Sequence, residues 1–321
     1  MTGSHAKVDG PLPIPLDALP ALNALFSEAF SERYRRDGMT GVRVPPLNPL
    51  IWRFAIECAG EGAMIWRDGL GQIAAFNLAH ISGTEGWMGP LAVREELQGH
   101  GLGRTIVGAG IERLKRAGCT VIGLETMPRT MENIGFYAQL GFVPAPMTIT
   151  LTLEGTAGSA PLPELLSSHA LAERERVIAE CATLAASVRP GSNYSREIAI
   201  TLRHGIGDCA LLRDAGGALT GFALYHEVPL VEGRSREELR VLKLVVVDVK
   251  ELVRVAESLR ALSRRSGTLR VAIRMQGEFG EGFRALMALG ARVRWTDLRM
   301  VLAGRAERAP LRGLALSNWE I

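Results

Sequence analysis

The residue types that point most clearly to chemistry lie in one glycine-rich segment, Gln98-Gly99-His100-Gly101-Leu102-Gly103-Arg104. Its glycines let a ligand approach the backbone closely, and the amphipathic stretch that follows predicts a helix beginning near Gly101. The first N–H groups of a helix have no intrahelical partner and carry partial positive charge. The segment therefore predicts a phosphate-binding site.

Two common phosphate-binding loops fit this segment poorly. A dinucleotide-binding turn places its glycines directly after a strand and a third glycine where Arg104 stands, whereas here residues 94–98 intervene. A P-loop needs Gly-Lys-Ser/Thr, which is absent. A plain glycine-rich turn without a ligand stays open as an alternative on these residues alone.

The elements that must position the segment follow from hydrophobic pattern, glycines and prolines. The pattern predicts helices over 20–36, 49–59, 101–117 and 132–139, a hairpin within 63–76, and strands over 87–93, 120–126 and 148–153. An antiparallel start followed by a strand–helix–strand crossover is typical of a mixed sheet. Gly89-Pro90 predicts a bulge within its strand, because proline cannot donate to the ladder.

The chain also contains an internal repeat. Residues 67–76 match residues 213–222, and residues 136–143 match 285–292, in the same order and at nearly equal offsets. Such self-similarity predicts a tandem duplication. We expect one domain over 1–153, a linker rich in small residues and proline over 154–163, and a second domain over 164–321.

Two motifs give the first half a family resemblance. Leu91-Ala92-Val93 followed by Gln98-x-x-Gly101-x-Gly103-Arg104 resembles the acyl-CoA motif of the GNAT superfamily of N-acetyltransferases. Phe136-Tyr137-x-x-Leu140-Gly141-Phe142 is similar to the second hallmark of that family. The resemblance spans roughly residues 15–153. It implies an α/β fold of the α+β mixed-sheet kind, with two tandem GNAT-like domains, each a largely antiparallel mixed sheet flanked by helices.

The same resemblance implies where an acyl-CoA would bind. Backbone groups of Leu91, Ala92 and Val93 would meet the pantetheine arm, and Gln98 with the backbone from Gly99 to Arg104 would receive the pyrophosphate. The family often has an asparagine seven residues before its tyrosine, where this chain has Thr130. Asn133 is the remaining candidate for that cofactor contact.

The implied reaction is direct attack of an amine on a thioester carbonyl. The amine must lose a proton, the oxyanion needs a donor, and the departing thiolate needs a proton. The resemblance implies that Tyr137 is the general acid toward the sulfur, the alternative being a core tyrosine. Glu125, at a strand end, is the predicted general base. Glu85, His80 or a water chain are alternatives.

The second copy lacks these features. The offset places residues 247–252 opposite the glycine loop, Arg274 opposite Glu125 and Leu286 opposite Tyr137. We therefore expect a degenerate second domain that buttresses the first or shapes the acceptor site, and one acyl-CoA per chain. His226 is a candidate for that acceptor site, the alternative being a histidine at the end of a strand.

These features predict an N-acetyltransferase that transfers an acetyl group from acetyl-CoA to a primary amine of a small molecule or a peptide. A non-catalytic, acyl-CoA-binding regulatory protein is the alternative. Whether the chain forms a homodimer stays open.

Composition excludes several other classes of protein. With 47% hydrophobic and 22% charged residues the chain is globular, and no apolar run of about 20 residues predicts a membrane span. The first residues do not resemble a secretory signal, so we expect a cytoplasmic protein. A net charge of +3 without a basic and aromatic cluster argues against nucleic acid. Four scattered cysteines predict buried thiols and no metal site.

Overall fold

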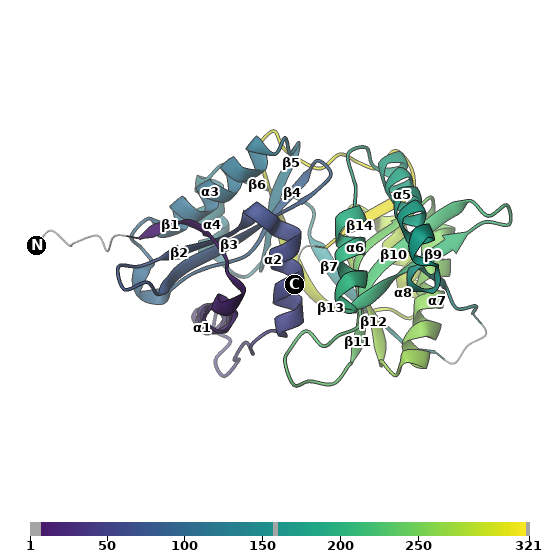
Figure 1. Cartoon of the computed structure of the whole chain (residues 1–321), viewed down its shortest axis with the longest axis horizontal. Coiled ribbons are helices and arrows are strands. Elements are labelled where there is room, and N and C mark those ends of the chain that lie inside the picture. The colour runs from purple at the N-terminus through teal and green to yellow at the C-terminus, as the bar shows by residue number, and fades with distance from the viewer. Residues whose placement is uncertain (1–7, 157–159, 319–321) are drawn as a thin grey trace, which may run out of the picture.

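The computed structural model describes residues 8–156 and 160–318. The first half of the chain forms four long helices and seven strands among these residues (Figure 1). They are β1 (Asp9–Pro13), α1 (Leu19–Arg36), α2 (Pro49–Ala59), β2 (Ala63–Arg67), β3 (Ile73–Ser82), β4 (Glu85–Val93), α3 (Leu102–Arg116), β5 (Val121–Thr126), α4 (Met131–Gln139), β6 (Phe142–Pro144) and β7 (Thr148–Glu154). The predicted helices and strands of this half are confirmed, although β3 extends beyond the predicted hairpin to Ser82, and β1 and β6 are absent from the predicted elements.

The second half repeats much of this order, as the predicted duplication requires. Its described elements are β8 (Glu164–Leu165), α5 (Leu171–Val188), α6 (Ser195–His204), β9 (Gly207–Arg213), β10 (Leu219–His226), β11 (Glu238–Val246), α7 (Val249–Ser266), β12 (Arg270–Gln276), α8 (Gly280–Ala288), β13 (Arg292–Leu302) and β14 (Leu314–Ser317). Short 3-10 turns precede α1 (Leu16–Ala18), β2 (Gly60–Gly62), α3 (Glu95–Leu97) and α5 (Leu166–Ser168).

The two halves share one continuous mixed sheet. Its order is β1-β2-β3-β4-β5-β13-β7-β12-β11-β10-β9-β8, so the last long strand of each half lies in the sheet of the other. Strand β13 pairs with β5 from Leu298↔Thr126 to Val301↔Gly123, and β7 pairs with β12 along its whole length. The mixed-sheet fold is confirmed, but the sheet does not divide at the predicted linker, of which residues 157–159 lie outside the described part.

Helices α2 and α6 join the halves at the centre of the molecule (Figure 1). Helix α2 begins at Pro49 because Asn48 caps it, its side chain accepting a hydrogen bond from the N–H of Leu50. Phe54 and Cys58 on α2 belong to the same hydrophobic core as the buried side chains of α5 and α6. The two halves therefore have a common core as well as a common sheet.

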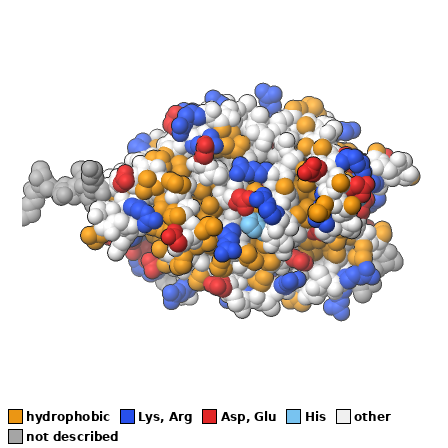
Figure 2. Space-filling view, viewed as in Figure 1, with side chains coloured by type: hydrophobic (Ala, Val, Ile, Leu, Met, Phe, Trp, Pro, Cys, Tyr) orange, Lys and Arg blue, Asp and Glu red, His pale blue; other side chains and the backbone are white. Residues whose placement is uncertain are grey.

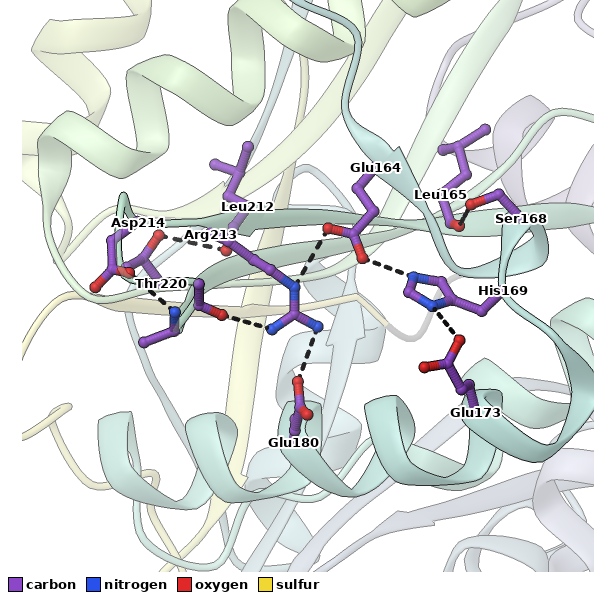
Figure 3. A network of polar contacts seen from close by, with 12 residues as sticks. Glu164, Leu165, Ser168, His169, Glu173, Glu180, Leu212, Arg213, Asp214 and Thr220 are labelled. Carbon is purple, nitrogen blue, oxygen red and sulfur yellow. Dashed lines mark hydrogen bonds and ion pairs between the residues drawn. The ribbon is translucent and has the colours of Figure 1, made fainter.

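A satisfied polar network holds the outer edge of the second half (Figure 3). Arg213 of β9 pairs with Glu164 of β8 and with Glu180 of α5, while Glu164 and Glu173 also contact His169. Arg176 also pairs with Glu173 at 3.4 Å, so each of the three carboxylates has an arginine within ion-pair distance. This cluster attaches β8 and α5 to the sheet.

The surface and the thiols agree with the composition. In the view of Figure 2, basic and acidic side chains are intermixed on the visible face. All four cysteines are buried and free, as predicted. Within the residues that the structure describes, no helix is long and apolar enough to cross a membrane, and no group of three metal-ligating side chains is found.

Candidate active site

The sheet of the first half opens between β4 and β5. These strands pair in parallel only from Glu85↔Val121 to Met88↔Leu124, and the described pairing does not extend to residues 89–93 of β4. The register between β3 and β4 shifts by one residue at the same place, which confirms the bulge predicted at Gly89-Pro90. The backbone of Leu91 to Val93 therefore borders an opening in the sheet.

The glycine loop lies at the start of α3, as predicted. Gly101 is the N-cap residue with φ +85°, and Gly99 has φ +78°, both in the left-handed region that favours glycine. A Cβ on either glycine would meet nothing within 4 Å, so the loop backbone faces open space. No described side chain caps α3, which leaves its first-turn N–H groups available to an anion.

Two side chains fix the shape of this loop. The Gln98 Nε2 donates to the carbonyl of Val93 at 2.9 Å, which ties the loop to the end of β4. Arg36 of α1 donates to the Gln98 Oε1 at 3.2 Å and pairs with Glu95. The loop is held from both sides before any ligand binds.

A cavity of about 730 Å³ connects the loop, the opening and the second half of the chain. Most of the predicted site residues line it, namely Leu91, Ala92, Val93, Gln98, Gly99, Gly101, Gly103, Arg104, Glu125, Asn133 and Tyr137. His100 and Leu102 do not line it, so a contact from either would come through the backbone. Residues of α1 and of the second half complete the walls.

Tyr137 on α4 lines the cavity but is otherwise enclosed by aromatic rings. The rings of Phe136 and Phe142 lie 5.2 and 6.1 Å from its own. Burial raises the pKa of Tyr137 to about 12, because the phenolate would be poorly solvated. The hydroxyl therefore keeps its proton at neutral pH, as a general acid must.

Thr130, seven residues before Tyr137, joins two helices rather than facing a cofactor. The Thr130 Oγ1 donates to Asp37 at the end of α1, at 2.7 Å. Arg33 pairs with the same Asp37 and with Glu132, so α1 is joined to the start of α4. Asn133 lies next to this junction and lines the cavity.

Glu125 has an environment unsuited to its predicted role as general base. Burial alone would raise its pKa, but Arg274 and Arg299 with Thr148 lower it to about 2. The Arg299 Nε lies 2.8 Å from the Glu125 Oε1, and Arg274 contacts the other carboxylate oxygen. A carboxylate this well stabilised as an anion is a weak proton acceptor. We assign Glu125 to the junction between the halves instead.

Unlike Glu125, the alternative bases Glu85 and His80 do not line the cavity. Glu85 is buried and pairs with Arg189 at 3.0 Å. The His80 Nε2 contacts the carbonyl of Gly89 at 3.0 Å, and burial lowers the pKa of His80 to about 4.

His226 lies in the second half, away from the cavity. Its Nε2 contacts the Thr201 Oγ1 at 3.1 Å, and the ring of Phe54 meets it edge-on. Burial lowers the pKa of His226 well below its usual range. The expectation that His226 reaches an acceptor site is wrong, since the side chain is enclosed in the shared core.

We predict that the junction formed by Glu125 depends on pH. Its folded pKa of about 2 lies below an unfolded value of 4.5, so Glu125 stabilises the fold above about pH 4.5, and this contribution is lost as pH falls toward 2. A shift of 4.5 − 2 = 2.5 pKa units corresponds to about 3 kcal/mol. The free energy of unfolding, measured in urea, should be lower for Glu125→Gln than for wild type by about this amount at pH 7. The difference between the two proteins should disappear near pH 2.

A matched control is Glu112→Gln, which removes a carboxylate with 63% of its side chain exposed. Its free energy of unfolding should stay within about 1 kcal/mol of wild type. A Glu125→Gln deficit that is constant between pH 7 and pH 2 would show that the charge of Glu125 does not stabilise the fold.

In the second half, the site that corresponds to the opening between β4 and β5 is occupied. Strands β11 and β12 pair in parallel from Glu238 to Val241 of β11 and then separate, as β4 and β5 do. Here, however, β14 pairs with Lys243–Val246 of β11. The Asp248 Oδ1 accepts a hydrogen bond from the N–H of Glu251 at 2.9 Å and caps α7. In the second half, β14 thus occupies the position that corresponds to the opening between β4 and β5. The carboxylate of Asp248 occupies the position that corresponds to the free N–H groups at the start of α3.

One acyl-CoA per chain is therefore the expected stoichiometry. Isothermal titration of the protein with CoA should give one site, because β14 and Asp248 obstruct the second copy. Two sites of similar affinity would contradict this reading of the second half.

Several residues that line the cavity could not be predicted from the sequence. Leu230, Arg274, Trp295 and Asp297 line the cavity from the second half. Their place depends on the exchange of β7 and β13 and on the isolated bridge between Leu47 and Val231. Neither feature can be read from local pattern.

Known proteins resemble the chain in sequence over one segment and in fold over its whole length. The sequence model of the Acetyltransferase (GNAT) family matches residues 21–142. Among curated proteins, none matches the chain in sequence.

Three solved structures illustrate the likeness in fold. A proposed acetyltransferase from Pyrococcus horikoshii has a TM-score of 0.67 at 14% identity, covering 98% of this chain and 96% of that one. A tandem GNAT protein from the clavulanic acid biosynthesis pathway has a TM-score of 0.57 at 13% identity, covering 92% and 98%. N-myristoyltransferase from Saccharomyces cerevisiae, solved with myristoyl-CoA, has a TM-score of 0.63 at 11% identity, covering 97% and 85%.

Proposed function

From the premise that residues 21–142 form a domain of the GNAT acetyltransferase family, we propose that the protein transfers the acetyl group of acetyl-CoA to a primary amine of a small molecule or a peptide. One observation carries the proposal. The opening between β4 and β5 runs from the uncapped start of α3 into the same cavity that Tyr137 lines.

The first half supplies the binding of the donor in this proposal. The N–H groups from Gly99 to Arg104 receive the pyrophosphate, where the positive end of α3 and the absence of side chains favour an anion. The unpaired edge of Leu91 to Val93 offers backbone groups to the pantetheine arm, as a sheet edge does to an added strand. Acetyl-CoA is thus aligned with its thioester at the bulge.

The chemistry then needs three groups. A backbone N–H near Val93 is placed to donate to the oxyanion that forms on the thioester carbonyl. Tyr137 gives its proton to the departing sulfur and is re-protonated from solvent, consistent with its pKa of about 12. Since Glu125 is held as an anion by two guanidiniums, the attacking amine passes its proton to water in the cavity.

The second half closes the cavity on the side of the acceptor. Leu230 and Val231 come from the segment between β10 and β11, which contacts the segment before α2 through the N–H of Asn48 and the carbonyl of Leu230 at 2.9 Å. We propose that the second domain shapes the acceptor site rather than binding a second acetyl-CoA. The protein is proposed to act in the cytoplasm, where acetyl-CoA is made and used.

The proposal is tested by release of free thiol from acetyl-CoA in the presence of a panel of primary amines and short peptides. At least one acceptor should accelerate release above the rate seen without amine, with formation of the N-acetyl product. Binding of acetyl-CoA without release from any acceptor would contradict enzymatic function and favour a regulatory acyl-CoA-binding protein.

A further inference from the structure

One region of the cavity wall is apolar and is formed by both halves of the chain. It consists of side chains from α1, from the connection between α1 and α2, from β4 and from the segment between β10 and β11. We call this region the apolar wall, and its residues are Phe26, Phe30, Val44, Leu47, Ala92 and Leu230. All of them belong to the hydrophobic core beneath α1 and α2 or pack against it. That core therefore extends to the cavity at the apolar wall.

The apolar wall lies across the sheet from the groups that are proposed to hold acetyl-CoA. Helices α1 and α3 cover opposite faces of the sheet of the first half (Figure 1). Ala92 belongs to the core on the α1 side, whereas its neighbours Leu91 and Val93 pack against the core on the α3 side. Tyr137 also belongs to the core on the α3 side. The α1 side of the opening is thus left for the acceptor.

Backbone contacts between the halves hold Leu230 at this wall. Its carbonyl accepts a hydrogen bond from the N–H of Asn48 at 2.9 Å, and the Asn48 Nδ2 donates to the carbonyl of Pro229 at 3.2 Å. Leu47 forms an isolated bridge with Val231. Because Asn48 also caps α2, the segment that carries Leu230 is fixed to the start of a helix.

The charged side chains of the cavity walls are in ion pairs with one another. These pairs are Arg36–Glu32, Arg33–Glu132, Arg274–Glu125 and Arg274–Asp297. A charged acceptor group would gain little from such a pair, because it would replace a partner that is already in place. An apolar group on the apolar wall would instead remove hydrocarbon surface from water on both sides of the contact.

We propose that the apolar wall binds an alkyl or aryl group of the acceptor, so that the acceptor class is a primary amine attached to such a group. The attacking nitrogen lies at the opening beside Val93 and Tyr137, and the carbon chain extends toward α1. The acetyl group of the donor is too short to leave the opening, and the apolar wall is thus free for the acceptor. The inference rests on the proposed function.

The experiment compares alkylamines with amino alcohols of equal length. Butylamine, hexylamine and octylamine are each paired with the amino alcohol in which a hydroxyl replaces the terminal methyl group, and kcat/KM is measured by thiol release from acetyl-CoA. For at least one pair the alkylamine should be preferred by about tenfold or more, because a hydroxyl against the apolar wall loses its water without gaining a partner. Equal kcat/KM values within every pair would overturn the inference.

A second comparison tests whether the donor occupies the apolar wall instead. Acetyl-CoA, butyryl-CoA and hexanoyl-CoA are compared with ethylamine as the acceptor, which is too short to reach the wall. The value of kcat/KM should be highest for acetyl-CoA. A preference for hexanoyl-CoA over acetyl-CoA would assign the wall to the acyl chain of the donor and overturn the inference.

Two variants locate the preference for hexylamine over its amino alcohol. Leu230→Asn replaces a half-buried apolar side chain by a polar one of similar size, and should reduce the preference by about fivefold or more while the affinity for CoA stays unchanged. Val44→Thr keeps the backbone hydrogen bonds of residue 44 to Ser27 and Ser31 and should reduce the preference by about two- to fivefold. The matched control is Leu70→Asn, at a position 84% exposed in the turn between β2 and β3, which should behave as wild type.

Failure of the inference is distinguishable from failure of the proposed function. Turnover of every alkylamine and its amino alcohol at equal kcat/KM, or a preference that survives in both Leu230→Asn and Val44→Thr, overturns the inference alone. Absence of thiol release from every amine, with CoA still bound, overturns both. A folded Val44→Thr keeps the test decisive if Leu230→Asn does not fold.

Discussion

Gly101→Glu is expected to abolish the binding of acetyl-CoA. The new carboxylate would stand at the start of α3, where we propose that the first-turn N–H groups receive the pyrophosphate. It would both repel the phosphates and cap the helix in their place. The affinity should fall by at least about 100-fold, or about 2.7 kcal/mol, measured by isothermal titration with CoA.

The matched control for this prediction is Gly101→Ala. It carries the same penalty for a side chain at φ +85°, about 1–2 kcal/mol, but adds no charge. Because the free and bound proteins share that penalty, the affinity for CoA should fall by less than about tenfold. An equal loss in both variants would attribute the effect to backbone strain, and retained affinity in Gly101→Glu would mean that the loop does not hold the phosphates.

Tyr137→Phe is expected to lower kcat by about 100- to 10,000-fold, the usual contribution of a general acid. The dissociation constant for CoA should change little, because the ring still packs between Phe136 and Phe142. Steady-state kinetics with a saturating acceptor, together with titration by CoA, separates the two quantities.

Tyr225→Phe serves as the control, because Tyr225 is buried in the core of the second half and does not line the cavity. Its kcat should equal that of wild type. If Tyr137→Phe also keeps the wild-type kcat, the hydroxyl of Tyr137 has no part in the chemistry, and the side chain serves only the core.

Local pattern predicted most of the elements that carry the site. Helix α2 begins at Pro49 and ends at Ala59 as predicted, since Asn48 caps it and Gly60 follows it. The start of α3 was predicted within one residue, because Gly99 and Gly101, both with positive φ, end the preceding turn. Elements that are fixed by caps and turns within a few residues can be read from the sequence.

The pairing of the last strands could not be predicted in this way. The pattern of residues 148–153 predicts a strand, but it does not say whether that strand joins β5 or β12. Both alternatives bury the same face of the strand, and only contacts far apart in the chain decide between them. The shared sheet is therefore a property of the whole duplicated chain.

Distance in sequence also explains why the environment of Glu125 could not be predicted. Its environment is set by Arg274 and Arg299, which lie 149 and 174 residues further along the chain. Considered alone, a glutamate at the end of a strand beside an opening is a reasonable base. With two guanidiniums beside it, the carboxylate becomes part of the junction between the halves.

The central claim is that the first half alone binds acetyl-CoA, through the glycine loop and the opening between β4 and β5. A crystal structure with bound CoA tests it most directly. The account predicts one CoA per chain, its pyrophosphate on the N–H groups from Gly99 to Arg104 and its pantetheine arm beside Leu91 to Val93. A CoA bound at α7 of the second half, or in the cavity with its phosphates away from Gly101, would contradict it.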